Sequence, residues 1–118
     1  MPKHAVKRTR TSDNVDGDAW QCLVQQYPQI AEAISGSVER LLSCTCLDER
    51  TTQLVYIAVQ TAVCYPLAVK YHVPLALQAG ATKDEIVGAA AIAAAAAGPK
   101  GFVVCFPSIL SETGKKNS

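Results

Sequence analysis

The fold of this chain is decided by residues 82–99, which read TKDEIVGAAAIAAAAAGP. Thr82 and Glu85 have the spacing of a capping box, in which each side chain accepts a hydrogen bond from the backbone N–H of the other residue. The run that follows is mostly alanine, the residue with the highest helix propensity, and Gly98-Pro99 is a typical stop signal. These features predict a helix over Ile86–Ala97. Because its side chains are small, we expect this helix deep in the core or at a subunit contact.

The stretch before this helix predicts another, which runs from Pro66 through His72 to Gly80. Proline suits the first turn of a helix, and glycine suits the left-handed position just after its end. Residues 51–64 are ambiguous, since a continuous apolar run rich in β-branched residues is also typical of a buried strand. Fourteen residues without glycine or proline are long for a strand and ordinary for a helix. We therefore favour a buried helix there and keep the strand as the alternative.

Two more helices are indicated nearer the N-terminus. Asp18 is a candidate N-cap of the first, whose apolar face comprises Trp20, Leu23, Val24 and Tyr27. Pro28 suits the first turn of the second, whose expected inner stripe comprises Ile30, Ile34, Leu41 and Leu42. Ser43 to Cys46 has the composition of a link, and Asp48 can cap the next element. Residues 101–110 form a short strand or a last helix. Five or six helices without convincing alternation predict an all-α bundle.

The length of 118 residues fits one domain. Residues 1–17 carry charges and almost nothing to bury, which predicts a flexible basic N-terminal tail. Residues 18–113 then form a single helical domain, and residues 114–118 form a flexible C-terminal tail.

Composition and charge exclude several classes of protein. The chain is 49% hydrophobic and 18% charged, as is ordinary for a globular protein. A net charge of +1 gives no global field to attract nucleic acid or an acidic membrane. The longest apolar run, residues 86–97, is shorter than the about 20 residues that a membrane span needs. Five cysteines without regular spacing, and a polar first segment, indicate reduced thiols and a cytoplasmic protein.

His72 is the one histidine inside the expected domain, and histidine is the usual acid–base group near neutral pH. On a helix it shares a stripe with Tyr65, while Glu49 and Gln53 share a stripe on the preceding helix. Pro74 cannot donate a hydrogen bond to the carbonyl of residue 70, so we expect the helix to bend beside His72.

The cysteines do not form a redox or metal motif. A dithiol centre usually has Cys-x-x-Cys at the start of a helix, and the chain contains only the Cys-x-Cys of Cys44 and Cys46. A zinc site needs two more ligands at suitable spacing. We therefore expect no metal and no cofactor. Cys22, Cys64 and Cys105 have apolar neighbours, where cysteine is usually a small buried hydrophobe.

Several stretches together resemble the carboxymuconolactone decarboxylase family, which includes the alkylhydroperoxidase D-like proteins. They are LDERT at residues 47–51, HVPLALQAGAT at residues 72–82, Glu85-Ile86, and the alanine-rich helix that ends at Gly98. The likeness covers roughly residues 47–107. It implies an all-α, alkylhydroperoxidase D-like bundle that assembles as a homo-oligomer, a trimer or a hexamer, with sites near subunit contacts. It also implies helix for residues 51–64 and for Phe102 to Leu110.

The peroxidase branch of this family carries a glutamate, a Cys-x-x-Cys pair and a histidine. The matching positions here hold Gln53, Tyr65, Ala68 and His72, so only the histidine is retained. Cys64 is one residue off register, about 100° round a helix. A thiol antioxidant would therefore have to use this displaced cysteine, with Cys44, Cys46 or Cys105 as its partner.

The decarboxylase branch has the histidine without the cysteines, as here. The resemblance implies cofactor-free loss of carbon dioxide from a small lactone acid, with His72 as the acid or base. Glu49 could orient the imidazole, and the cations that could hold the carboxylate are Arg50, Lys70 and Lys100. Two alternatives remain, the thiol antioxidant and a catalytically degenerate oligomer with the same fold.

Overall fold

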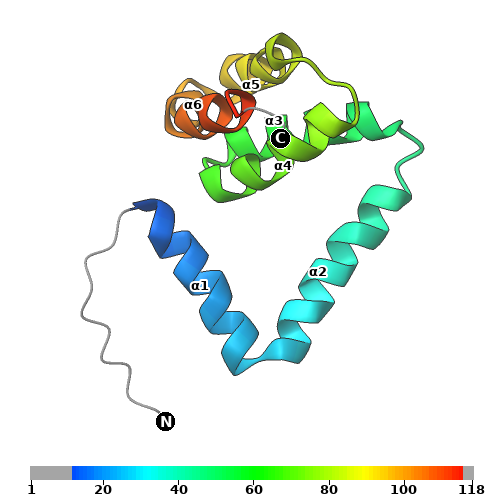
Figure 1. Cartoon of the computed structure of the whole chain (residues 1–118), viewed down its shortest axis with the longest axis vertical. Helices are drawn as coiled ribbons and strands as arrows, with labels where there is room; N and C mark the ends of the chain where they lie inside the picture. The colour runs from blue at the N-terminus through cyan, green and yellow to red at the C-terminus, as the bar shows by residue number, and fades with distance from the viewer. Residues whose placement is uncertain (1–11, 116–118) are drawn as a thin grey trace. The chain divides into compact units, whose positions relative to one another are not determined.

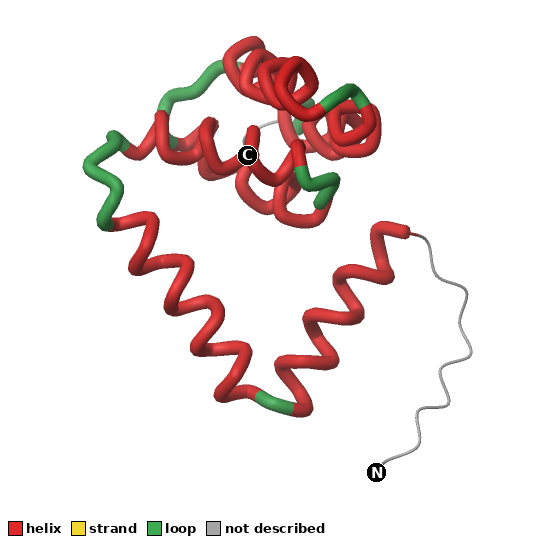
Figure 2. The backbone as a smooth tube through the Cα atoms, turned by 180° about the vertical axis from the view of Figure 1, so that it is seen from behind, coloured by secondary structure: helices red, strands yellow, loops and turns green. Residues whose placement is uncertain are grey.

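The computed structural model describes residues 12–115, and every regular element in that range is a helix (Figure 1, Figure 2). The helices are α1 (Ser12–Gln26), α2 (Pro28–Ser43), α3 (Glu49–Ala62), α4 (Pro66–Gln78), α5 (Lys83–Ala97) and α6 (Lys100–Thr113). The all-α prediction is confirmed, and the strand alternatives for residues 51–64 and 101–110 are wrong. None of these helices is both long enough and apolar enough to cross a membrane.

The N-terminal boundary differs from the expected one. Helix α1 begins at Ser12, so Asp18 lies inside the helix and not at its start. Gly17 does not end the helix, because one glycine costs a helix only about 1 kcal/mol. The rest of the expected N-terminal tail, residues 1–11, and residues 116–118 of the C-terminal one lie outside the described residues.

The chain divides into two compact units, one up to Gly36 and the other from Ser37 onward. We expected one domain over residues 18–113, with an inner stripe on the second helix. Of that stripe, Ile30, Ile34 and Leu41 are exposed, and Ala31 is the residue of α2 that is buried. The apolar stripe of α2 is therefore largely exposed on the single chain.

The core of the second unit lies among α3, α4, α5 and α6 (Figure 1). Helix α3 packs against α4 and α5, and α6 packs against the same two helices. The largest fully buried side chains include Ile57, Ile86 and Ile109, one from each of three helices. Each contributes about 1.5–3 kcal/mol of hydrophobic free energy. Helix α5 buries Ile86, Ala90 and Ala93, so one face of it lies in the core, which is one of the two places expected for it.

Two caps place the charged residues at the starts of α3 and α5. The capping box of α5 is present, with Glu85 N 3.1 Å from Thr82 Oγ1 and Thr82 N 2.9 Å from Glu85 Oε1. At the start of α3, Asp48 Oδ1 accepts a hydrogen bond from Thr51 N at 2.7 Å. Hydrogen bonding by Thr51, through its side chain and then its backbone N–H, holds the pKa of Asp48 below its ordinary value. Both caps were predicted from the sequence.

The backbones of α3 and α6 approach each other closely at Gly101, which is buried in the first turn of α6. A Cβ atom built on Gly101 would lie 1.8 Å from the carbonyl oxygen of Thr61. No side chain larger than hydrogen fits there unless one of the helices moves. The start of α6 is therefore pressed directly onto the end of α3.

Candidate functional site

A chain of hydrogen bonds links α3 to the histidine of α4. His72 Nδ1 lies 2.8 Å from Gln53 Oε1, and Gln53 Nε2 donates to Glu49 Oε2 at 3.0 Å. Glu49 and Gln53 are one helical turn apart, so their side chains follow the same face of α3 toward His72. Gln53 is buried, and His72 is half-buried. The structure thus brings together three residues that the sequence placed on two separate stripes.

This chain fixes which nitrogen of His72 carries the proton in the neutral ring. A carboxylate only accepts hydrogen bonds, so the amide nitrogen of Gln53 must face Glu49. The amide oxygen then faces His72 and can only accept, which requires a proton on Nδ1. The lone pair is left on Nε2. His72 therefore has one nitrogen held by the protein and one available as a base.

Two tyrosine rings contact the imidazole. Tyr56 stacks on His72, with ring centroids 3.8 Å apart and an angle of 26° between the planes. Tyr71 meets the ring edge-on, with centroids 6.1 Å apart. The sequence motifs did not single out Tyr56, although it lies on the face of Gln53, three residues further along α3. The expected aromatic neighbour, Tyr65, is instead the N-cap residue of α4.

Burial lowers the pKa of His72 below its ordinary value of 6.5. The cause is desolvation, because the half-buried ring loses water that would stabilise its charged form. His72 is therefore neutral at neutral pH, with the lone pair on Nε2. A neutral imidazole of this kind is suited to accept a proton, and its protonated form is a stronger acid than free histidine.

The same shift predicts how stability depends on pH. The unfolded chain takes up a proton on residue 72 near pH 6.5, and the folded protein does so only at lower pH. The contribution of His72 to stability is therefore fully present above pH 6.5 and is lost as pH falls toward the folded-state pKa. In the His72→Asn variant, the amide nitrogen can still donate to Gln53 but does not titrate.

We expect urea unfolding to show a smaller loss of stability for His72→Asn than for the unchanged protein when the pH is lowered from about 7.5 to about 5.5. Glu49, Tyr56 and Tyr71, the titratable neighbours of the ring, are retained in both proteins. Equal losses in the two proteins would contradict a desolvated His72.

The three candidate cations do not gather around His72. Arg50 forms a two-point ion pair with Glu85, in which Arg50 Nε lies 3.3 Å from Glu85 Oε1 and Arg50 Nη2 contacts Oε2. Lys70 is exposed and lies two residues before His72, about 200° away round α4. Lys100 is exposed in the first turn of α6. Arg50 is thus the cation nearest along the chain to Glu49, but Glu85 already neutralises it.

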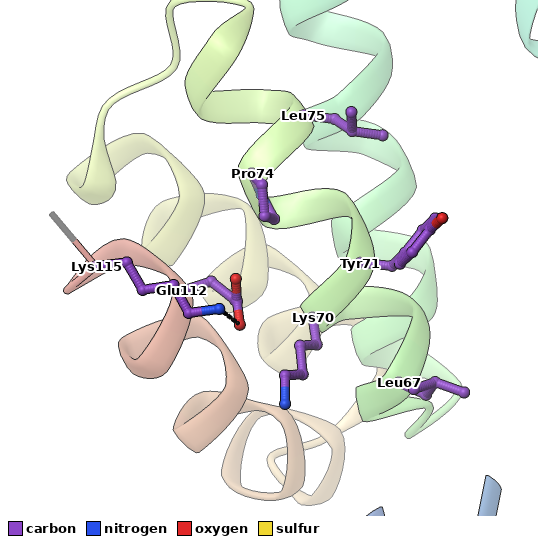
Figure 3. Close-up of a pocket in the computed structure, with 7 residues that line it drawn as sticks. All are labelled: Leu67, Lys70, Tyr71, Pro74, Leu75, Glu112 and Lys115. Carbon is purple, nitrogen blue, oxygen red and sulfur yellow. Dashed lines mark ion pairs between the residues drawn. The ribbon is translucent and has the colours of Figure 1, made fainter. Parts of the chain in front are cut away.

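Two pockets are each lined by one of the tyrosines that contact His72, and neither is lined by His72 itself. One, of about 190 Å³, is lined by residues that include Thr52, Tyr56 and Gln60 of α3. The other, of about 510 Å³, lies between α4 and the end of α6 (Figure 3). Its lining residues are Leu67, Lys70, Tyr71, Pro74, Leu75, Glu112 and Lys115. Tyr56 thus contacts the imidazole and lines the smaller pocket, and Tyr71 contacts the imidazole and lines the larger one.

The larger pocket contains a buried carboxylate. Glu112 is 5% exposed, and its Oε2 lies 2.9 Å from Lys115 Nζ. In Figure 3 the Lys70 side chain extends toward α6 on the same side of α4 as Glu112. Pro74 lines this pocket from within α4.

The cysteines occupy different environments. Cys22, Cys44 and Cys46 are exposed, Cys64 is partly buried and Cys105 is buried, and all five are free thiols. The expectation that Cys22 is buried is therefore wrong, whereas that for Cys105 is confirmed. In the described part of the chain, no three histidine, cysteine or acidic side chains gather closely enough to hold a metal ion.

Comparison with known proteins gives one match. The model of the carboxymuconolactone decarboxylase family matches residues 28–103, which include α3, α4, α5 and the hydrogen-bond chain from Glu49 to His72. No curated protein and no solved structure matches the chain significantly.

Proposed function

The chain belongs to the carboxymuconolactone decarboxylase family, and we propose that it is a cofactor-free carboxy-lyase, or a related acid–base enzyme, in which His72 transfers a proton to or from a small lactone acid. The observation that carries this proposal is the 2.8 Å contact between His72 Nδ1 and Gln53 Oε1. That contact leaves Nε2 as the one nitrogen that can exchange a proton with a bound molecule. A positioned imidazole of low pKa is the usual acid–base group of such reactions.

The decarboxylation needs no cofactor if the conjugated carbonyl system of the substrate accepts the electron pair of the broken bond. When the bond between the carboxylate carbon and its neighbour breaks, carbon dioxide leaves and the electron pair enters the conjugated carbonyl system. A dienolate results, which must gain one proton on carbon. His72 protonated at Nε2 donates that proton and regains it from solvent. Proton transfer by a positioned side chain contributes roughly 10²–10⁴-fold to a rate.

Glu49 and Gln53 are positioning residues in this proposal, because they hold the ring and do not reach the reacting atoms. Their contacts favour the tautomer that the reaction uses. Lys70 and Lys100 are the candidates to hold the substrate carboxylate, since both are exposed cations. Arg50 could serve only if its ion pair with Glu85 opens.

The proposal is tested by incubating the protein with a carboxymuconolactone and measuring the carbon dioxide released. We expect release by the unchanged protein and a fall of about 100-fold or more in the rate for His72→Asn. Lys83→Ala, at an exposed position on α5, is the matched control and should retain the rate. If the unchanged protein releases no carbon dioxide from any lactone acid tried, the carboxy-lyase reading fails.

We further propose that the protein is a cytoplasmic homo-oligomer, a trimer or a hexamer, with the site near a subunit contact. Large apolar side chains stand exposed on the single chain, among them Leu41, Val59, Val63 and Ile92. Monomeric proteins rarely expose large contiguous apolar patches. The free state of all five thiols fits a reducing compartment. Light scattering coupled to size-exclusion chromatography gives the mass, and a monomer would overturn the oligomer.

A further inference from the structure

The pocket between α4 and the end of α6 is lined from α6 by a buried carboxylate and from α4 by a face that combines a cation with apolar groups (Figure 3). Lys70 and Pro74 lie on the side of α4 that faces Glu112. The neighbouring row of α4 also lines the pocket and comprises, at spacings of four residues, Leu67, Tyr71 and Leu75. The volume of about 510 Å³ is that of a small-molecule site, for which about 300–1,000 Å³ is usual.

The buried carboxylate of Glu112 has an incomplete set of partners. Burial of a carboxylate is costly unless hydrogen bonds and a counterion compensate for the lost water. Lys115 Nζ lies 2.9 Å from Glu112 Oε2 but outside the angles of a hydrogen bond, so this oxygen has no hydrogen bond with the described residues. The side chain of Lys115 is 63% exposed, and an ion pair to so exposed an ammonium is weak. Glu112 therefore offers an acceptor that a donor group of a ligand can satisfy better than Lys115 does.

The charges of the pocket select the charge of its ligand. Lys70 is exposed and forms no ion pair within the part of the chain that the structure describes, so its ammonium is available to an anion. A ligand with a carboxylate alone would meet the like charge of Glu112, and a ligand with an ammonium alone would meet Lys70 and Lys115. A ligand that carries both groups can place each beside its opposite. The leucines and the proline of the lining require, in addition, an apolar body.

We propose that this pocket binds an α-amino acid with an apolar side chain. The ammonium of the amino acid takes the place of Lys115 Nζ and donates to the carboxylate of Glu112. The carboxylate of the amino acid accepts from the ammonium of Lys70. Both contacts are charge-assisted hydrogen bonds, which are stronger than those between neutral groups. The side chain of the amino acid lies against the apolar lining, which includes the ring of Tyr71.

This site is independent of the proposed proton transfer by His72. It uses no atom of His72, Gln53 or Glu49, and Lys70 is the one residue that both proposals use. Lys100 remains as the other candidate to hold a lactone acid. Failure of one proposal leaves the other unaffected, because binding of an amino acid and release of carbon dioxide are measured separately.

Three molecules with the same carbon skeleton test the two charges: L-phenylalanine, 3-phenylpropanoate, which lacks the ammonium, and 2-phenylethylamine, which lacks the carboxylate. Each is titrated into the full-length, isotope-labelled protein, and binding is followed by the shifts of the backbone amide NMR signals. We expect L-phenylalanine to shift the amide signals of Lys70, Tyr71 and Glu112, and each of the other two molecules to bind at least about tenfold more weakly. Equally tight binding of either analogue, or no shifts in α4 and at the end of α6, would overturn the proposal.

Variants assign each charge to its partner. Lys70→Met should weaken binding of L-phenylalanine about tenfold or more but not that of 2-phenylethylamine, whereas Glu112→Gln should weaken L-phenylalanine but not 3-phenylpropanoate. Lys115→Ala removes the competing ammonium and should bind L-phenylalanine at least as tightly as the unchanged protein does; weaker binding would contradict the exchange.

Lys83→Met, at an exposed position on α5, is the matched control and should bind as the unchanged protein does. Circular dichroism checks that each variant is folded. If Glu112→Gln does not fold, the comparison of the three molecules in the unchanged protein still decides the outcome.

Discussion

Replacing Gly101 by alanine is expected to lower the free energy of unfolding by about 3 kcal/mol, at the upper end for an overpacked core. The new methyl carbon would start 1.8 Å from the carbonyl oxygen of Thr61 and 2.9 Å from its carbonyl carbon. Both are backbone atoms of α3, so no side chain can rotate to make room. Either α6 moves away from α3 or the end of α3 distorts. Each movement disturbs the packing of buried Cys105 and Ile109, which follow on the same helix.

The matched control is Gly88→Ala in α5. Gly88 is also inside a helix, but it is exposed, and its Cβ position has no neighbouring heavy atom within 4 Å. Alanine there should raise the free energy of unfolding by about 0.5–1 kcal/mol, because it reduces the conformational freedom of the unfolded chain. Urea unfolding followed by circular dichroism measures both. A free energy of unfolding that rises for Gly101→Ala, as for Gly88→Ala, would contradict the close approach of Gly101 to Thr61.

The elements that could be predicted are those whose signals are local. The capping box of Thr82 and Glu85 and the stop at Gly98 lie within a few residues of the helix they define. The cap at Asp48 and the left-handed Gly80 after α4 are of the same kind. Local hydrogen bonds and backbone preferences decide these positions, and tertiary structure does not alter them. The helix over residues 51–64 was ambiguous because burial on several sides removes the amphipathic period.

The features that could not be predicted depend on which helices meet. Nothing in the sequence GPKG, residues 98–101, distinguishes the glycine after α5 from the one pressed against α3. The ion pair of Arg50 with Glu85 joins residues 35 positions apart. Its formation removes Arg50 as a free cation, a result that only the packing of α3 against α5 reveals. The same holds for Cys64, whose sulfur lies 3.4 Å from the Cβ position of Gly101 in α6.

Part of the candidate site, the residues Glu49, Gln53 and His72, could be predicted from the sequence. Helical spacing placed Glu49 with Gln53, and the family resemblance paired Gln53 with His72. The contact between Gln53 and His72 could not be predicted from spacing, because it depends on α3 and α4 lying side by side. The spacing also indicates Tyr56, which continues the face of Gln53 by one turn and stacks on His72.

Exchanging the positions of the carboxylate and the amide on α3 is expected to reverse the direction of the His72 pKa shift. The double variant Glu49→Gln/Gln53→Glu has the same net charge and the same atoms. Gln at position 49 can donate to the new glutamate as Gln53 now donates to Glu49. The one change is that a carboxylate, instead of an amide oxygen, lies beside His72 Nδ1, where the present contact is 2.8 Å. A directly bonded anion favours the imidazolium and opposes desolvation.

The pKa of His72 should then lie above 6.5 instead of below it. The sign of the linkage reverses with it: the contribution of His72 to stability is fully present below the unfolded-state pKa and is lost as pH rises through the folded one. NMR titration of the imidazole carbon-bound protons measures the pKa, and His4→Asn leaves one histidine to observe. The single variant Glu49→Gln is the control and should keep the shift downward, because residue 53 is still an amide. A pKa of His72 that stays below 6.5 in the exchanged variant would mean that residue 53 does not hold the ring.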